Sequence, residues 1–150
     1  MTTGAWIAIV AVGVALAFGL YRARTDGRYR QATPGPDPTD GVDTTPEQPG
    51  VLADTPWADQ VGERATLLQF SSAFCAPCRA TRRILTDVAA EQPGIAHIEV
   101  DAEQHLDVVR RLGILRTPTT IVLGPDGHEL GRAVGAPTKH QVLASLPATG

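Results

Sequence analysis

The stretch ATLLQFSSAFCAPCRATRRIL, residues 65–85, decides the expected fold of this chain. Its first part is a short apolar run that is typical of a buried strand, and its last part repeats apolar side chains at helical spacing. The two cysteines of the chain, Cys75 and Cys78, lie at the junction, with Pro77 between them. Proline is tolerated in the first turn of a helix, where its missing N–H needs no partner. The pattern therefore predicts a strand that leads into a helix, with both thiols at the helix N-terminus.

This position predicts the chemistry of the two thiols. The unpaired N–H groups and the positive dipole end of a helix favour a thiolate, and they can lower a cysteine pKa from about 8.5 to about 7 or below. We expect Cys75 to be the nucleophile and Cys78, one turn further on, to resolve a mixed disulfide. Half a zinc site and an inert core pair are the alternatives, but the four histidines lack the paired spacing of zinc ligands. We therefore expect thiol–disulfide exchange without a metal or another cofactor.

The rest of the domain alternates short apolar runs with helical patterns, which predicts an α/β fold. Strands are expected at residues 65–70, 95–101, 119–123 and 129–134. Helices are expected after Cys75, near residues 103–112, and from Thr138 onward, where Thr138 is the expected N-cap. The first helix should turn Ala80, Ile84, Leu85, Val88 and Ala89 inward and Arg79, Arg82 and Arg83 outward. The last helix should carry Val142, Leu143 and Leu146 inward.

The N-terminal region contains an uncharged run, AWIAIVAVGVALAFGLY, at residues 5–21, after a tail of residues 1–4. At about 1.5 Å per residue, a helix of this length reaches the lower limit of what can span a hydrocarbon core, so the run predicts one transmembrane helix. A cleaved signal peptide is the alternative, although no basic segment precedes the run. Four arginines follow it, at positions 22, 24, 28 and 30. By the positive-inside rule we expect a cytoplasmic domain and lipid contact through residues 5–30, with an extracytoplasmic domain as the alternative.

Residues 22–50 are predicted to link this helix to the domain. After the arginines, residues 31–50 hold five prolines, three glycines and four acids with almost no large apolar side chain. Such a composition cannot form a core, so it predicts a disordered, extended linker and leaves residues 51–150 as the domain. The formal net charge of the whole chain is −3. This charge argues against a general nucleic-acid-binding role.

The motif FCAPC resembles the active site of the thioredoxin family, with Phe74 as the aromatic residue and Ala76 in place of the usual glycine. Three further segments match the family in the same order: VD at 100–101, LGILRTPTTIVL at 112–123 and GRAVGAPT at 131–138. The resemblance covers roughly residues 65–146. It implies a thioredoxin-like fold, in which helices flank a central mixed sheet, with the first strand and helix of the family shortened to residues 51–61.

The resemblance also implies the other parts of the site. Thr117–Pro118 should be a cis peptide bond that faces the cysteines and exposes the Thr117 backbone to an extended substrate segment. An apolar docking surface should surround the sulfurs, formed by Phe74, Ala76, Pro77, Pro118, Gly135 and Ala136. The implied partners are disulfide-containing protein substrates and a recycling reductase or membrane electron donor.

Two positions depart from the family pattern. Gln69 occupies the place of a buried aspartate beneath the cysteines, and His97 occupies that of its lysine partner. His97 could accept a proton through Gln69, or it could be a hydrogen-bonded histidine on a covered strand. From all these features we expect a membrane-tethered thiol–disulfide oxidoreductase. A membrane-anchored interaction module without redox turnover is the alternative.

Overall fold

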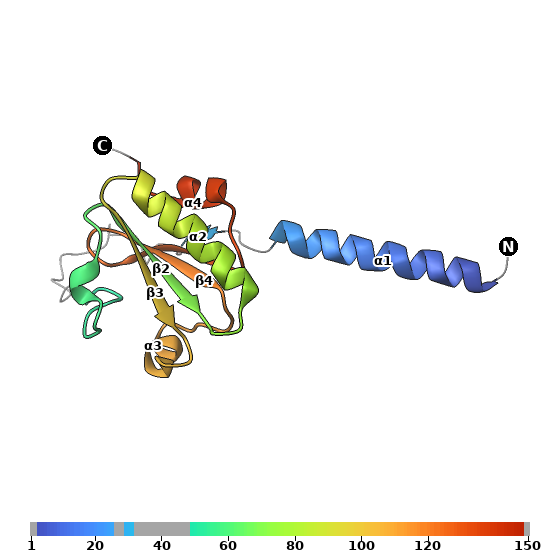
Figure 1. Cartoon of the computed structure of the whole chain (residues 1–150), viewed down its shortest axis with the longest axis horizontal. Coiled ribbons are helices and arrows are strands. Elements are labelled where there is room, and N and C mark those ends of the chain that lie inside the picture. Colours follow the sequence, from blue (N-terminus) through green and yellow to red (C-terminus); the bar gives the residue numbers. More distant parts are fainter. Residues whose placement is uncertain (1–2, 26–28, 32–48, 149–150) are drawn as a thin grey trace, which may run out of the picture.

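The computed structural model describes residues 3–25, 29–31 and 49–148. Its centre is a five-stranded sheet with the strand order β1-β5-β4-β2-β3 (Figure 1). The strands are β1 (Tyr29–Gln31), β2 (Ala65–Ser71), β3 (Ile95–Asp101), β4 (Thr119–Leu123) and β5 (Glu129–Val134). The helices are α1 (Thr3–Thr25), α2 (Ala76–Glu91), α3 (Leu106–Arg111) and α4 (Lys139–Ser145), with a short 3-10 helix, η1 (Ala58–Gln60). Only β2 and β3 pair in parallel, so the sheet is mixed, and the α/β expectation is confirmed.

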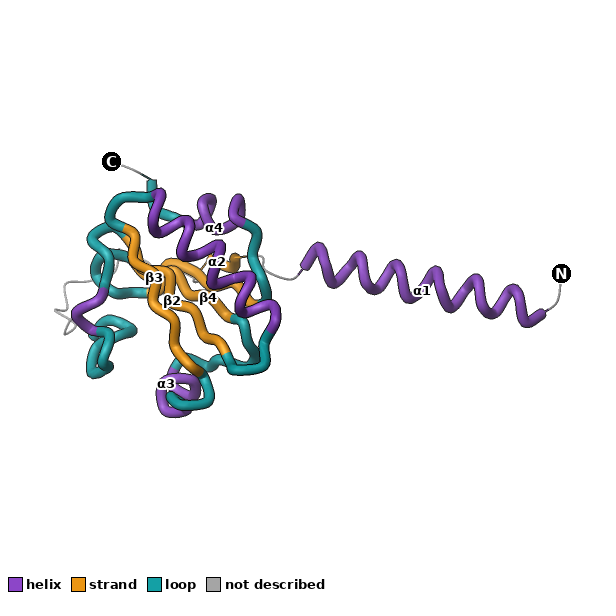
Figure 2. The backbone as a smooth tube through the Cα atoms, in the orientation of Figure 1, coloured by secondary structure: helices purple, strands orange, loops and turns teal. Residues whose placement is uncertain are grey.

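The central strand β2 supplies side chains to both faces of the sheet. Leu68 and Phe70 belong to one buried cluster, which includes Val108 from α3. Ala65 and Leu67 belong to the other cluster, under α2 and α4. Successive strand side chains point to opposite faces, which explains this division. The sheet thus lies between α2 and α4 on one face and α3 with residues 51–61 on the other (Figure 2).

Helix α2 buries a slightly different face from the predicted one. Its buried residues are Cys78, Thr81, Leu85 and Val88, whereas Ala80 is exposed. The observed spacing of three, four and three residues is that of one helical face. Because Cys78 is buried, the residue three positions further on, Thr81, lies on the same face and Ala80 does not. The prediction for Ala80 was therefore wrong, while Leu85 and Val88 point inward as expected.

The other two helices of the domain differ from the predictions mainly at their ends. Helix α3 starts later than predicted because the Asp101 carboxylate accepts hydrogen bonds from the Glu103 N–H and the Gln104 side chain, which hold residues 102–104 in a turn. Helix α4 begins after Thr138, which forms a capping box with Gln141. In this helix Val142 is buried as predicted, whereas Leu143 is 38% exposed and Leu146 is half-buried.

The N-terminal helix α1 covers the predicted transmembrane run and continues past Tyr21 to Thr25. Its described large apolar side chains are between 52% and 69% exposed. Within the residues that the structure describes, no helix has the combination of length and apolar character needed to cross a bilayer. The predicted transmembrane helix is therefore not confirmed.

Strand β1 lies within the segment that was predicted to be a linker. It pairs antiparallel with β5, with Tyr29 opposite Ala133 and Gln31 opposite Gly131. Tyr29 packs against the buried cluster under α2 and α4, which gives this short strand its anchor. The prediction of an unstructured segment was wrong for these three residues, and residues 32–48 of the predicted linker lie outside the described part of the chain.

Candidate functional site

Cys75 and Cys78 form a disulfide, so the structure represents the oxidised protein. Cys75 is the N-cap of α2, and its sulfur accepts a hydrogen bond of 3.1 Å from the Cys78 backbone N–H. Cys75 is half-buried, whereas Cys78 is only 2% exposed. In the reduced protein the same N–H would stabilise a thiolate on Cys75, because it is one of the unpaired donors at the helix N-terminus. The local geometry thus favours Cys75 as the attacking sulfur.

The segment before β4 joins the site through a cis peptide bond. The Thr117–Pro118 bond is cis, as the resemblance implied. The side-chain oxygens of Ser72 and Thr117 are 3.1 Å apart and share a hydrogen bond, which ties the loop before the cysteines to the cis-proline loop. Gly135 donates its N–H to the Pro118 carbonyl at 2.8 Å and has a φ of 97°, a conformation that glycine adopts readily. Three predicted segments of the site therefore meet in the structure.

Exposed apolar side chains lie on the segments that carry the cysteines and the cis-proline. Phe74 is 100% exposed, and Ala76, Pro77 and Ala136 are also exposed, whereas Pro118 is buried and Gly135 is half-buried. The sequence analysis did not single out Leu115, which is 95% exposed in the loop before the cis-proline. A leucine between Gly113 and Pro118, outside any helical or strand pattern, is the signal that could have identified it. We call Phe74 and Leu115 the apolar rim, because they are exposed on the two loops that the Ser72–Thr117 hydrogen bond joins.

Beneath the cysteines, Gln69 and His97 belong to one hydrogen-bonded network. Gln69 is completely buried, and its Nε2 donates to the Cys78 carbonyl at 3.0 Å. Its Oε1 is 3.2 Å from His97 Nε2, and His97 Nδ1 is 3.1 Å from Thr86 Oγ1. Since Gln69 Oε1 can only accept, His97 carries its proton on Nε2, and Nδ1 of the neutral ring accepts from the Thr86 hydroxyl. The network therefore connects the strand pair β2–β3 to the main chain of α2.

The electrostatic environment of His97 favours its neutral form. Burial lowers the pKa of His97 below its ordinary value of 6.5. The Glu99 carboxylate raises the pKa and the Arg82 guanidinium lowers it, both with a smaller effect than burial. Both ring nitrogens already have hydrogen-bond partners, and the network reaches Cys78 at its carbonyl oxygen. This geometry favours the hydrogen-bonded role of His97, and proton transfer through Gln69 and His97 stays a prediction.

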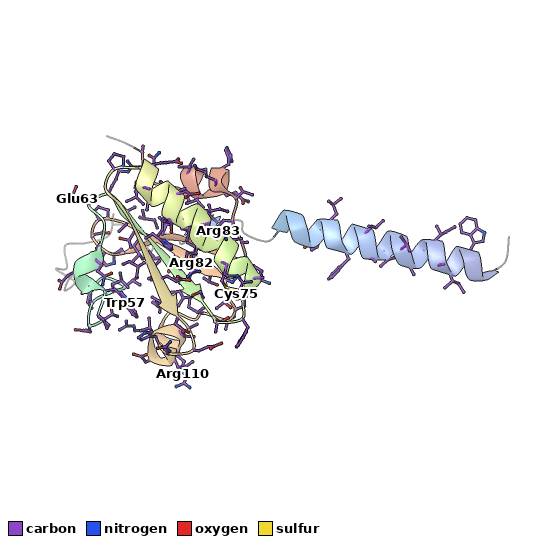
Figure 3. All side chains as sticks on the ribbon, viewed as in Figure 1. Trp57, Glu63, Cys75, Arg82, Arg83 and Arg110 are labelled. Carbon is purple, nitrogen blue, oxygen red and sulfur yellow. A yellow bond between two sulfur atoms is a disulfide. The ribbon has the colours of Figure 1, made fainter. Side chains whose placement is uncertain are left out.

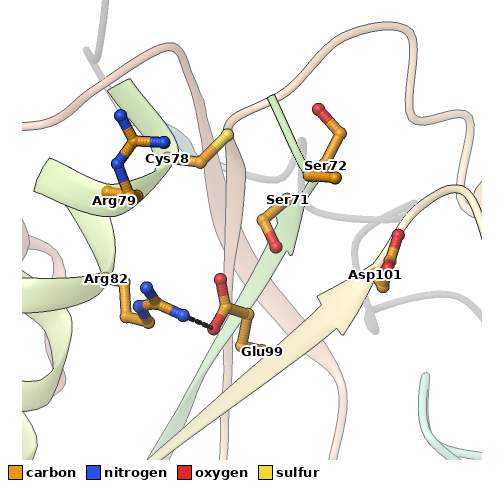
Figure 4. Close-up of a pocket in the computed structure, with 8 residues that line it drawn as sticks. Ser71, Ser72, Cys78, Arg79, Arg82, Glu99 and Asp101 are labelled. Atoms are coloured by element: carbon orange, nitrogen blue, oxygen red, sulfur yellow. Dashed lines mark hydrogen bonds and ion pairs between the residues drawn. The ribbon is translucent and has the colours of Figure 1, made fainter. Parts of the chain in front are cut away.

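A polar cleft of about 320 Å³ lies beside Cys78, between the start of α2 and the ends of β2 and β3 (Figure 4). Its lining consists of Ser71, Ser72, Ala73, Cys78, Arg79, Arg82, Glu99 and Asp101. Arg82 and Glu99 form an ion pair of 3.1 Å across the cleft, and Figure 3 shows Arg82 and Arg83 along α2, which begins near Cys75. The sequence analysis named Asp101 only in the VD match and did not assign Glu99 or Asp101 to the site, because their position beside α2 depends on how β3 packs against the helix.

An α/β domain with a cysteine pair at a helix N-terminus, next to a cis-proline loop, is typical of thiol–disulfide oxidoreductases. The sequence model of the thioredoxin family matches residues 48–148. The chain belongs to the thioredoxin family. This membership and the cysteine pair support thiol–disulfide oxidoreductase activity in general terms.

Individual relatives agree with this assignment. The chain is 27% identical to a thioredoxin of Chlamydia trachomatis over 93 residues, which are 62% of this chain and 90% of the relative. It is 31% identical to a thioredoxin of Mycolicibacterium smegmatis over 86 residues, 55% of this chain and 76% of the relative. The crystal structure of a thioredoxin from Nicotiana alata superposes with a TM-score of 0.50 at 23% identity, over 55% of this chain and 70% of that one, which indicates a shared fold.

Proposed function

We propose that the protein reduces or exchanges disulfide bonds of polypeptide substrates through the dithiol of Cys75 and Cys78. The single observation that carries this proposal is the Cys75–Cys78 disulfide at the first turn of α2, where Cys75 accepts the Cys78 N–H. A sulfur that caps a helix is stabilised as a thiolate, and a second sulfur one turn away can displace a bound substrate.

The reaction has two exchange steps. The Cys75 thiolate attacks one sulfur of the substrate disulfide, the substrate S–S bond breaks, and a mixed disulfide with Cys75 forms. The Cys78 thiolate then attacks the sulfur of Cys75, so that the Cys75–Cys78 bond forms and the substrate leaves with both sulfurs reduced. Two electrons pass from the dithiol to the substrate. A reductase or a membrane electron donor would restore the dithiol.

Substrate binding would use the surface around the disulfide. An extended substrate segment would pair with the Thr117 backbone and pass over the small residues at Ala76, Pro118 and Gly135. The apolar rim supports this role, because two nearly fully exposed large apolar side chains lie on loops joined by the Ser72–Thr117 hydrogen bond.

The N-terminal segment is the basis for a proposal about where the protein lies in the cell. We propose that residues 5–21 contact membrane lipid and that the domain lies on the cytoplasmic side. The predicted lipid-contacting segment, residues 5–30, is too long at its end, because Tyr29 and Arg30 belong to β1 and pair with β5. The uncharged run at residues 5–21, its exposed apolar side chains and the arginines that follow support this location. A variant without Cys75 and Cys78 but with a single reporter cysteine in the predicted linker should co-sediment with membranes. In intact cells, impermeant thiol reagents should fail to label that cysteine. Ready labelling would instead indicate an extracytoplasmic domain.

The redox proposal is tested with single cysteine variants of the full chain. Cys78→Ser should accumulate mixed disulfides with substrate proteins, because the resolving thiol is missing, and Cys75→Ser should accumulate none. Both variants should lose the reduction of a disulfide-bonded protein while circular dichroism shows an intact fold. Trapping by Cys75→Ser alone would reverse the two roles. Unchanged binding of partners by both variants, with no reduction by the wild-type chain, would indicate an interaction module.

A further inference from the structure

Cys78 must lose a proton before it can attack a mixed disulfide, and its surroundings decide where that proton goes. On the inner side lies Gln69, whose neutral amide donates to the Cys78 carbonyl and cannot take up a proton at ordinary pH. Behind it, both ring nitrogens of His97 are engaged, Nε2 with Gln69 and Nδ1 with Thr86. The described residues beneath α2 therefore offer hydrogen bonds at this point, but no group that is ready to accept the proton.

On the outer side, Cys78 meets the polar cleft. Cys78 is only 2% exposed, and its side chain is nevertheless part of the cleft lining (Figure 4). A cleft of about 320 Å³ has room for several water molecules, each of which occupies about 30 Å³ in the liquid. The cleft is thus the space beside Cys78 that can hold water.

The charged side chains of the cleft differ in whether they have hydrogen-bond or ion-pair partners. Arg82 is paired with Glu99 at 3.1 Å. Both carboxylate oxygens of Asp101 accept hydrogen bonds, one from the Glu103 N–H and one from Gln104. In contrast, the guanidinium of Arg79 has no hydrogen-bond or ion-pair partner among the described residues. Arg79 follows Cys78 directly and lines the same cleft, so it is an uncompensated positive charge next to this sulfur (Figure 4).

The other elements around the cysteines contribute mostly neutral groups, together with the charged Arg116. Strand β2 contributes the neutral Gln69 and Ser71, and the cis-proline loop contributes Thr117. Arg116 in that loop directs its guanidinium to the Val134 carbonyl. From β3, His97 is held in its neutral form by burial.

We propose that Cys78 ionises outward: its proton leaves to water in the cleft, and the positive charge of Arg79 stabilises the thiolate that remains. This inference rests on the proposed function, since it concerns the resolving step. Water takes up the proton of the Cys78 thiol, and the thiolate attacks the Cys75 sulfur of the mixed disulfide. The Cys75–Cys78 bond forms as the bond to the substrate breaks, and the substrate sulfur leaves as a thiolate that is protonated by water. Arg79 is in this view an electrostatic positioning residue.

The test measures the ionisation of Cys78 directly. In the full chain with Cys75→Ser, Cys78 is the only thiol, and the rate of its alkylation by iodoacetamide as a function of pH gives its pKa. Arg79→Gln should raise this pKa by about half a unit, as expected for an exposed, partly screened charge, and Arg79→Lys should restore it. Arg83→Gln removes the same charge from the same helix outside the cleft and should leave the pKa unchanged.

Two further variants decide the direction of proton loss. Glu99→Gln should lower the pKa of Cys78, because it leaves Arg82 unpaired in the cleft, and His97→Gln should leave it unchanged. Equal pKa values for Arg79→Gln and Arg83→Gln, or a pKa that moves only with His97→Gln, would overturn outward ionisation. Alkylation needs no substrate, so a pKa that depends on Arg79 in a protein without disulfide reduction would refute the proposed function alone.

Discussion

Replacing Gln69 with leucine tests how much the buried amide beneath the cysteines contributes to the free energy of unfolding. Gln69 is completely buried on β2, where it donates to the Cys78 carbonyl at 3.0 Å and accepts from His97 at 3.2 Å. Leucine fills much of the same space, but it has neither a donor nor an acceptor. The variant therefore removes two hydrogen bonds without opening a large cavity.

The expected cost follows from the partners that are left behind. A buried polar group without a partner costs about 1–3 kcal/mol. The Cys78 carbonyl can still accept the backbone hydrogen bond of the helix. The group that loses its partner is therefore mainly the His97 N–H. The apolar leucine side chain offsets a part of this loss, and we expect the free energy of unfolding to fall by about 2 kcal/mol. For a domain of about 100 residues, this corresponds to a fall in Tm of about 10 °C.

Urea unfolding of the oxidised chain, followed by circular dichroism, measures this cost. A double-mutant cycle with His97→Leu should give a coupling energy of about 1 kcal/mol, because the two side chains share a hydrogen bond. Thr81→Val is a matched control, since the buried Thr81 hydroxyl has no hydrogen-bond partner and its loss should not destabilise the protein. An unchanged stability of Gln69→Leu, or no coupling with His97, would refute the structural role of the amide.

Three other perturbations test separate parts of the structure. Leu115→Ser should raise the KM for a disulfide-bonded protein but leave the rate with a small aliphatic disulfide unchanged, and Leu143→Ser on α4 should change neither; equal effects of both variants would contradict a rim contact. Burial lowers the pKa of His97, so the unfolded chain takes up a proton at a higher pH than the folded chain. The free energy of unfolding should therefore decrease as the pH is lowered below about 6.5, and it should decrease less in His97→Gln. Parallel urea titrations at several pH values check this. Thr138→Ala removes the capping box of α4 and should cost about 1 kcal/mol in thermal unfolding, whereas an unchanged Tm would show that the cap contributes nothing.

Much of the fold follows from local sequence patterns. The strands at residues 95–101, 119–123 and 129–134 have the predicted bounds, because each is a short run with clear turn or helix signals beside it. Position on a helix face was harder to predict, as Ala80 and Thr81 show. Helical spacing alone cannot choose between two adjacent small residues; in the structure Thr81 shares the buried face with Cys78, whose carbonyl accepts a hydrogen bond from Gln69 of β2.

Two features that the sequence did not indicate, strand β1 and the cleft, depend on tertiary contacts. Strand β1 has only three residues, too few for a periodic pattern, and it exists because Tyr29 finds a buried cluster and β5 provides an edge. The lining of the cleft beside Cys78 includes the ion pair between Arg82 and Glu99, which are 17 residues apart in the sequence. Residue types alone do not predict such a pairing.

The Gln69–His97 network beneath the cysteines is neutral, whereas the cleft beside them is lined by charged side chains. A buried carboxylate at position 69 would carry a desolvation cost that only strong pairing could offset. Gln69 and His97 are both neutral, and their hydrogen bonds connect β3 through β2 to the Cys78 carbonyl. This part of the core therefore contains no buried charge from either side chain. A charge that assists Cys78 can then lie on the exposed Arg79, where water solvates it and salt screens it. In this arrangement the stability of the domain depends on the interior, and the reactivity of Cys78 depends on the surface.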